Sequence, residues 1–413
     1  MKFLLGIPFL SLVCLFYSCQ STPPADPDPA PLNHLAGFWL GQSLANWTGL
    51  VTEMDKIGDV GEIRTGPFYT RSDWGGPDRP NIWSGDTISD ISPVIDFVLV
   101  RGDSAWGADD DTDVEYMYQE LLLANDTALL TPEMIRAGWL RHIRAAEENY
   151  LWVSNQRAFD LMEKGMLPPA TSEPANNEHW AMIDAQLTTE IFGLYAPGDV
   201  ELALRLAELP IRTTAAGEAA QIARFYVAMY AIGAGETPLE SPRPRVQSWA
   251  EAAKRVLTPG DYPAAMYDFV KAQYAAGVPW EQARDAVYQR YQVEARDGYT
   301  ITHDSLYCNG CFAAGINFAA SLISLFYGEG DFKETVRIGT LCGWDSDNPT
   351  ATWGGLLGYV YGRDQLHHLF GDDLSDRFWI HRTRQNFPND GYDDFTSMAE
   401  KGLRVRELVG RLR

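Results

Sequence analysis

The stretch "LCGWDSDNPTATWGGLLGYVYG" (residues 341–362) joins two aspartates to a helix-like run that is rich in glycine and apolar residues. Asp345 and Asp347 stand two positions apart, so both carboxylates project to one side of a turn or extended segment and can address one ion. The flanking residues are apolar, and the glycines indicate close packing between helices. Carboxylates held between buried helices need a counter-charge. We therefore expect a cation-binding turn inside a helical protein.

A second acidic stretch, "GADDDTD" (107–113), directly precedes the helix-like run "VEYMYQELLLAN". Neighbouring residues of a helix are rotated by about 100°, so Asp109, Asp110 and Asp111 must occupy the turn that leads into it. One carboxylate can cap the helix, and the others are the oxygen ligands that hold hard divalent cations such as Mg²⁺. Alone, this stretch is most simply an acidic solvated turn. Paired with Asp345 and Asp347, it favours a metal site.

Most of the chain beyond residue 32 has helical patterning. Thr131 with the proline after it is a typical helix start, Asp199 is a predicted cap, and Pro210 is a predicted helix end. The one candidate strand is 94–103. We expect helices over 33–49, 131–152, 198–210, 216–235 and 317–328. These patterns predict an all-α orthogonal multi-helix bundle that forms a single domain over residues 33–413.

Residues 58–92 break the helical pattern, because they are rich in glycine, proline, aspartate and aromatic residues. A segment of this length and composition is either an elaborate loop near a site or a surface insertion of no consequence.

Cys308 and Cys311 form the motif "CNGC" without a further Cys or His pair at zinc-finger spacing. We interpret them as a buried structural pair or a local disulfide rather than a redox or metal site.

The N-terminus has the features of an export signal. Residues 1–19, "MKFLLGIPFLSLVCLFYSC", combine an early lysine, an apolar stretch and a small residue before Cys19. The end of this segment looks like a bacterial lipobox, so we expect Cys19 to be lipidated and residues 20–32 to form a Pro-rich tether. An ordinary cleaved signal peptide is the alternative. Either way we expect export, and with a lipobox the protein is anchored by lipid in the bacterial periplasm or at the cell surface.

The net charge of −23 and the absence of a long basic cluster exclude binding to nucleic acid. The acidic stretches resemble those of the ADP-ribosylglycohydrolases. That family has an early helix ending in Glu, an acidic motif opening a helix, and a late acidic motif followed by a small-residue helix. Their counterparts, in family order, are "GQSLANWTGLVTE" (41–53), "DDDT" (109–112) and "GWDSDN" (343–348), with "FYGEGDF" (326–332) before the last.

The resemblance implies the same all-α bundle and a site with two Mg²⁺ ions, for which Mn²⁺ can substitute. The metal-binding positions of the family fall on Asp109, Asp110, Asp111, Asp345, Asp347 and Asn348. Glu53 matches the residue that acts on the water or the scissile bond. Asn46, Gln186 and Asn309 match polar positions that line the substrate cleft, and relatives often carry Asp in place of Asn46.

Two departures from the family pattern concern charge. Asp109 and Asn348 stand where relatives usually have Thr, so the first motif carries an additional negative charge. Five aspartates and Glu53 carry six formal negative charges, whereas two divalent ions supply four positive ones. A site that stays negative disfavours the pyrophosphate of ADP-ribose.

The predicted function is metal-dependent hydrolysis of an N- or O-glycosidic bond in ADP-ribose or a related furanoside. The substrate is then a small-molecule or protein-linked glycoside, and we expect a monomer. Two alternatives remain at this stage. One is an exported glycosidase or nucleoside-type hydrolase that scavenges environmental carbohydrate, and the other is a non-catalytic ligand-binding lipoprotein.

Overall fold

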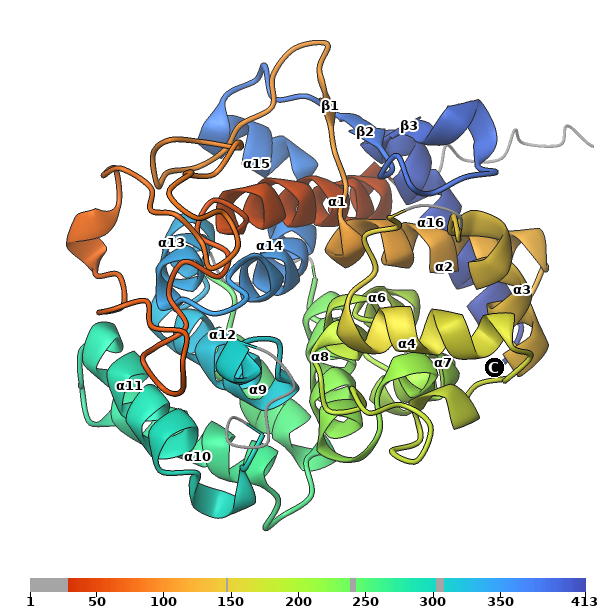
Figure 1. The fold of residues 1–413 in the computed structure, drawn as a ribbon. Coiled ribbons are helices and arrows are strands. Elements are labelled where there is room, and N and C mark those ends of the chain that lie inside the picture. The colour runs from red at the N-terminus through yellow and green to blue at the C-terminus, as the bar shows by residue number, and fades with distance from the viewer. Residues whose placement is uncertain (1–28, 146–147, 238–242, 302–307) are drawn as a thin grey trace, which may run out of the picture.

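The computed structural model describes residues 29–145, 148–237, 243–301 and 308–413. These residues form a mostly helical molecule, which confirms the predicted all-α bundle (Figure 1). The helices are α1 (Pro29–Gly49), α2 (Asp110–Ala124), α3 (Pro132–His142), α4 (Val153–Glu163), α5 (Asp184–Leu187), α6 (Ile191–Tyr195), α7 (Val200–Thr214), α8 (Gly217–Gly235), α9 (Val246–Ala253), α10 (Tyr262–Ala275), α11 (Trp280–Val287), α12 (Ala314–Gly328), α13 (Phe332–Cys342), α14 (Asp347–Tyr361), α15 (Arg363–Phe370) and α16 (Phe395–Gly410).

Helices α1 and α14 pack against each other in the centre of the molecule (Figure 1). Glycines allow their backbones to approach closely. A Cβ atom at Gly41 would lie 2.4 Å from the carbonyl oxygen of Gly354, and one at Gly358 would lie 2.3 Å from that of Gly37. The close packing that the glycines of 341–362 predicted is therefore present, and it holds the end of α1 against the start of α14.

Three short strands form one small sheet at the edge of the bundle. They are β1 (Ala105–Trp106), β2 (Arg377–Trp379) and β3 (Tyr392–Asp394). Strand β2 lies in the middle, parallel to β1 and antiparallel to β3. The sheet joins the segment before α2 to the C-terminal part of the chain, which ends in α16.

The prediction of one helix over 131–152 was wrong. Thr131 caps α3 as expected, but this helix ends at His142. Ile143 then pairs with Arg384 in an isolated β-bridge, and the N–H of Arg144 donates to the carbonyl of Thr383. The carbonyl oxygen of Asn149 also accepts a hydrogen bond from the buried Arg384. Pairing with 383–384 thus replaces the helical hydrogen bonds.

Two further predictions fail in detail. Asp199 caps α7 as predicted, but Pro210 lies inside this helix rather than at its end, since a proline removes only one hydrogen bond and Pro210 is buried. Residues 94–103 form no continuous strand. Isolated bridges occur at Val94 and Arg101, and the N–H of Val98 donates to the hydroxyl of Thr48 instead of to a strand partner.

The N-terminal predictions concern mostly residues 1–28, so Cys19 and residues 20–28 of the proposed tether lie outside the described residues. Helix α1 begins at Pro29, four residues before the predicted start, so the last residues of the proposed tether are helical. None of the helices in the described part of the chain has the length and apolar character that a membrane crossing requires.

Candidate active site

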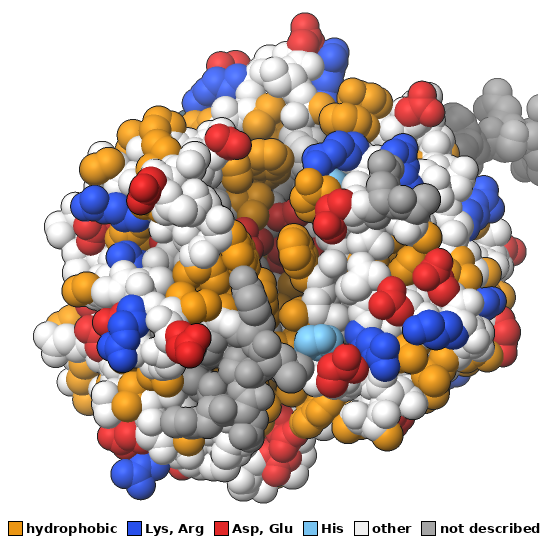
Figure 2. Space-filling view, viewed as in Figure 1, with side chains coloured by type: hydrophobic (Ala, Val, Ile, Leu, Met, Phe, Trp, Pro, Cys, Tyr) orange, Lys and Arg blue, Asp and Glu red, His pale blue; other side chains and the backbone are white. Residues whose placement is uncertain are grey.

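A cavity of about 280 Å³ opens where the predicted acidic motifs meet. The space-filling view shows a cleft with acidic side chains at its base and hydrophobic side chains along its walls (Figure 2). The lining comes from segments that are far apart in the sequence. It consists of Leu50, Glu53, Trp83, Asp109, Asp110, Asp111, Asp113, Tyr150, Trp152, Val153, Ile183, Asp184, Leu187, Phe312, Asp345, Asp347, His381 and Arg384.

The first acidic group, here the Glu53 triad, consists of Glu53, Asp345 and Asp347. Each offers a carboxylate oxygen, and these oxygens lie within 4.8 Å of one another. The triad forms because the chain after α1 runs beside the turn before α14. The N–H of Met54 donates to the carbonyl of Trp344 at 2.9 Å, and the hydroxyl of Ser346 donates to the carbonyl of Gly49 at 3.0 Å.

The second group, the Asp109 triad, consists of Asp109, Asp110 and Asp111, whose oxygens also lie within 4.8 Å of one another. Asp109 is the N-cap of α2 and accepts the N–H of Asp111 at 3.2 Å, while Asp110 and Asp111 begin the helix. The predicted capping role of one carboxylate is therefore confirmed. Asp110 and Asp111 do not cap the helix, and both line the cavity.

Buried amides hold the Asp109 triad, and one of them, Asn348, directly follows Asp347 in the chain. Asn348 donates to Asp111 at 3.2 Å and accepts from Gln186 at 2.8 Å, and Asn46 donates to Asp109 at 3.0 Å. Asn46, Gln186 and Asn348 are all fully buried. None of the three belongs to the cavity lining, so the structure places them behind the acidic groups rather than on the wall that a ligand meets.

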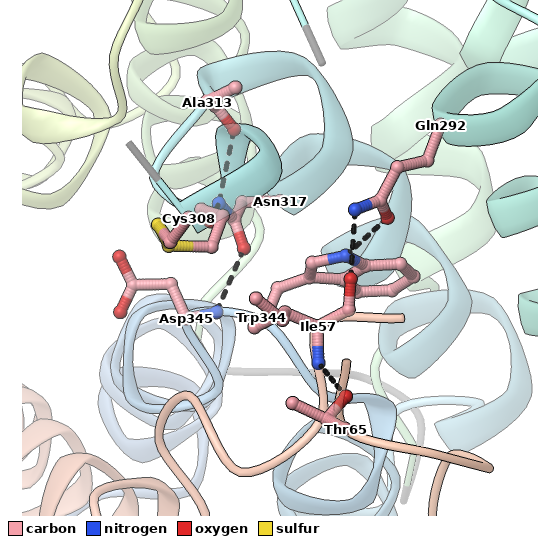
Figure 3. The surroundings of a disulfide bond; sticks show 9 residues. Ile57, Thr65, Gln292, Cys308, Ala313, Asn317, Trp344 and Asp345 are labelled. Atoms are coloured by element: carbon pink, nitrogen blue, oxygen red, sulfur yellow. Dashed lines mark hydrogen bonds between the residues drawn. A yellow bond between two sulfur atoms is a disulfide. The ribbon is translucent and has the colours of Figure 1, made fainter. Parts of the chain in front are cut away.

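The predicted local disulfide is present between Cys308 and Cys311, and Cys342 is a buried free thiol. Asn317 connects the disulfide turn to the Glu53 triad (Figure 3). Its amide donates to the carbonyl of Cys311 at 2.7 Å, and its side-chain oxygen accepts the N–H of Asp345 at 3.2 Å. The disulfide turn thus helps to position Asp345. The side chain of Asn309 lies outside the described part of the structure, so its predicted role remains a prediction.

The triads concentrate negative charge in a buried place. Burial, and then repulsion by neighbouring carboxylates, raises the pKa of Glu53, Asp110, Asp111 and Asp345 well above the ordinary value. The same causes raise the pKa of Asp109 to about 8, although the hydrogen bond from Asn46 lowers it. Burial also raises the pKa of Asp347. An added cation would relieve this repulsion.

Sequence reasoning did not identify the two other carboxylates of the cavity as site residues. Asp113 forms an ion pair with Arg384, at 2.8 Å between Oδ2 and Nε, and both side chains are almost completely buried. Asp184 accepts hydrogen bonds from the hydroxyl of Ser154 at 2.6 Å and from the N–H of Asn155 at 2.8 Å. Burial raises the pKa of each aspartate to about 6, although these partners lower it. Asp113 belongs to the acidic stretch "GADDDTD" and could have been proposed as a site residue from the sequence. Arg384 lies in no recognisable motif.

Aromatic side chains form the mouth of the cavity. The rings of Trp83 and Trp152 are nearly parallel, with centroids 6.4 Å apart and planes at 9°. Trp83 also stacks on Phe312, at 5.8 Å and 14°. Trp83 belongs to the irregular segment 58–92, so this segment reaches the site, as one of the two interpretations of its composition predicted.

The fold and the cavity together define an all-α protein with a pocket lined by carboxyl groups. The sequence matches the family model described as ADP-ribosylglycohydrolase over residues 27–407. The chain belongs to the ADP-ribosylglycohydrolase family, and this membership supports a glycosidic hydrolase. It confirms the resemblance stated from the acidic motifs.

Solved structures are also similar to the chain. One of them is described as an ADP-ribosylglycohydrolase-related protein complex, with a TM-score of 0.48, 15% identity, and coverage of 92% of this chain and 100% of the other. No match was found among the curated proteins.

Proposed function

We propose that the protein is a divalent-metal-dependent hydrolase that cleaves an N- or O-glycosidic bond of ADP-ribose or a related furanoside. The observation that carries this proposal is the meeting of the Glu53 triad and the Asp109 triad on one cavity. Members of the family act on ADP-ribosylated substrates and typically depend on a divalent metal, which supports the reaction class.

The residues present fit a divalent cation. Five of the candidate ligands are carboxylates and the sixth, Asn348, offers an amide oxygen, and such oxygen ligands suit Mg²⁺ or Mn²⁺. Oδ1 of Asp347 is buried and has no hydrogen-bond partner among the described residues. We assign the ligands to Asp109, Asp110, Asp111, Asp345 and Asp347. Asn348 remains a predicted ligand through the second lone pair of its side-chain oxygen, because the first accepts from Gln186.

When bound, two such ions orient the hydroxyls of the sugar and polarise the bond that breaks. We assign Glu53 the role of general base, because its carboxylate lines the cavity beside Asp345 and Asp347, where it can accept a proton from the attacking water. Asn317 holds the backbone of Asp345, and Asn46 holds Asp109. Gln186 donates to Asn348. These contacts make Asn46, Gln186 and Asn317 positioning residues in this proposal.

We also propose that Cys19 carries a lipid anchor and that the protein works in the bacterial periplasm or at the cell surface. The support is the sequence of residues 1–32 alone. Radiolabelled fatty acid that is incorporated into the full chain, and lost in Cys19→Ser, supports the anchor. Equal labelling of both forms, or of neither, contradicts it.

The experiment that tests the function is a substrate panel with metal control. Purified protein is incubated with ADP-ribosyl-arginine, ADP-ribosyl-serine and nitrophenyl furanosides, in chelator and after addition of Mg²⁺ or Mn²⁺. We expect turnover of at least one substrate, lost in chelator and restored by metal. Turnover that is unaffected by chelator contradicts the metal-dependent mechanism. Metal binding without any turnover supports a ligand-binding lipoprotein instead.

A further inference from the structure

The charge of the cavity bears on the substrate. Eight carboxyl groups of the described residues line it, namely those of Glu53, Asp109, Asp110, Asp111, Asp113, Asp184, Asp345 and Asp347. Among the described lining residues, Arg384 is the one permanent cation. Its guanidinium is bound to Asp113, to the carbonyl of Asn149 and to the hydroxyl of Thr383. These contacts within the protein occupy the guanidinium of Arg384, so it does not offer its charge to an anionic substrate.

His381 adds no positive charge at neutral pH. Burial, and then the nearby Arg384 and Arg382, lowers the pKa of His381 to about 4. The N-terminus of α2 also offers no anion site, because its own aspartates occupy it. Two divalent ions and Arg384 would supply five positive charges against the eight carboxyl groups. With these carboxyl groups ionised beside bound metal, the lining would keep a net negative charge, which disfavours a pyrophosphate with its two further negative charges.

The walls at the mouth of the cavity are apolar and aromatic, whereas its base is acidic. The side chains of Trp83 and Trp152 are 44% and 50% exposed, which is unusual for tryptophan. They belong to two separate segments of the chain, and both line the cavity that holds the triads. Together with Phe312 they present flat apolar faces beside the acidic base. Such faces bind the C–H surface of a sugar or another flat ring by stacking.

We propose, on the basis of the function proposed above, that the substrate is an uncharged glycoside. In this proposal the furanose ring lies at the two triads, and the leaving group is an uncharged ring, such as a second sugar, that packs against Trp83 and Trp152. Hydrolysis breaks the bond from the anomeric carbon to the leaving-group atom. Water supplies the hydroxyl on the furanose and the proton on the leaving group, so no other reactant is needed.

An exposed cation near the mouth of the cavity supports the alternative that the substrate is the charged ADP-ribose. Arg382 is exposed, its guanidinium lies 4.7 Å from the ring centroid of Tyr150, and it donates to the Tyr150 hydroxyl at 2.7 Å. A phosphate that entered the cavity would find Arg382 at the rim. If ADP-ribose is a substrate, Arg382→Ala should weaken its binding.

The experiment compares kcat/KM for nitrophenyl furanosides and for ADP-ribosyl-arginine in wild-type protein with Mg²⁺. It then compares Trp83→Ala and Trp152→Ala with the control Trp379→Ala. Trp379 is 37% exposed and stacked on Tyr392, and it does not line the cavity. We expect at least a hundredfold preference for a furanoside, and about a tenfold increase in KM in the two mouth variants, with little change in kcat or in the control.

A direct binding measurement accompanies the kinetics. Tryptophan fluorescence is titrated with ADP-ribose and with nitrophenyl riboside, with and without Mg²⁺. We expect quenching by the uncharged ligand in the wild type and much weaker quenching in Trp83→Ala.

The outcomes separate this proposal from the one on which it rests. Preferred turnover of ADP-ribosyl-arginine, weakened by Arg382→Ala, overturns the uncharged substrate and leaves the glycohydrolase intact. Unchanged KM in both mouth variants overturns the role of the tryptophans. No turnover of any substrate overturns the proposed function itself.

Discussion

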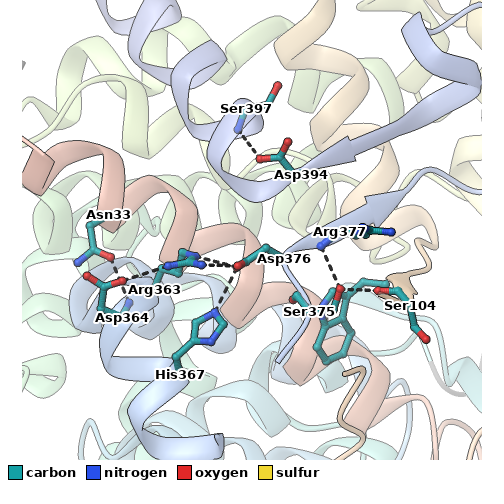
Figure 4. A network of polar contacts seen from close by, with 11 residues as sticks. Asn33, Ser104, Arg363, Asp364, His367, Ser375, Asp376, Arg377, Asp394 and Ser397 are labelled. Atoms are coloured by element: carbon teal, nitrogen blue, oxygen red, sulfur yellow. Dashed lines mark hydrogen bonds and ion pairs between the residues drawn. The ribbon is translucent and has the colours of Figure 1, made fainter. Parts of the chain in front are cut away.

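The carboxylate of Asp376 and the carboxylates of the cavity experience opposite electrostatic conditions. Beside the small sheet, Asp376 accepts hydrogen bonds from Arg363 and His367 (Figure 4). These partners outweigh burial and lower the pKa of Asp376 to about 2. In the cavity, burial and mutual repulsion raise the pKa of Asp109 and its neighbours. The protein supplies cations where the carboxylate is structural, whereas no basic side chain among the described residues pairs with the triads, where we propose that a metal binds.

The largest expected effect concerns chemistry rather than stability. Glu53→Gln removes the proposed general base and keeps the size of the side chain, so we expect turnover to fall about 1,000-fold while metal affinity is retained. The measurement is kcat on the best substrate of the panel, with metal binding followed by calorimetry. Asp376→Asn is the control, and it should keep the wild-type rate at a temperature where it is folded. A wild-type rate in Glu53→Gln would remove Glu53 from the mechanism.

The second prediction compares a carboxylate of the cavity that has a basic partner with those that have none. Asp113 is the one carboxylate of the GADDDTD motif with a buried basic partner, so Arg384→Met leaves it buried and unpaired. We expect the free energy of unfolding to fall by about 3 kcal/mol or more, measured by denaturant titration. The exposed neighbour provides the control, since Arg382→Met should change stability by less than about 1 kcal/mol. Equal losses in the two variants would contradict the structural role of the Asp113 pair.

A smaller effect, with a defined pH dependence, is expected at Asp376. Its pKa is depressed in the fold, so its contribution to stability is present above pH 4 and is lost as the pH falls towards 2. Asp376→Asn should therefore lower the free energy of unfolding by about 1 to 2 kcal/mol at pH 7. Denaturation curves at several pH values check this. A loss that persisted unchanged at pH 2 would point to packing rather than charge.

The sequence was sufficient to predict the helical class and the acidic centre. Helical periodicity and caps such as Thr131 and Asp199 act over a few residues, so they are visible locally. The glycines of 341–362 also predicted the close contact with another helix, which the Gly41 and Gly354 backbones make. Recognising that the acidic motifs share one site required pairing motifs more than two hundred residues apart and knowing their order in the family.

The features that the sequence did not predict depend on contacts between residues that are far apart in the chain. The helix after Thr131 stops early because Ile143 pairs with Arg384, a residue 241 positions later in the chain. For the same reason Arg384 could not be recognised as the partner of Asp113. The stacked Trp83 and Trp152 come from separate loops, and no periodic pattern relates two such loops.

The most direct test of the account is a thermal unfolding experiment with metal. In wild-type protein we predict that Mg²⁺ or Mn²⁺ raises Tm in a concentration-dependent manner relative to chelator, because the ions bind the folded state only. Asp347→Asn removes one ligand and one buried charge. In chelator it should be at least as stable as wild type, and it should lose most of the metal-dependent rise. A wild-type Tm that is the same in chelator and in millimolar metal would contradict the central claim that the two triads form a metal site.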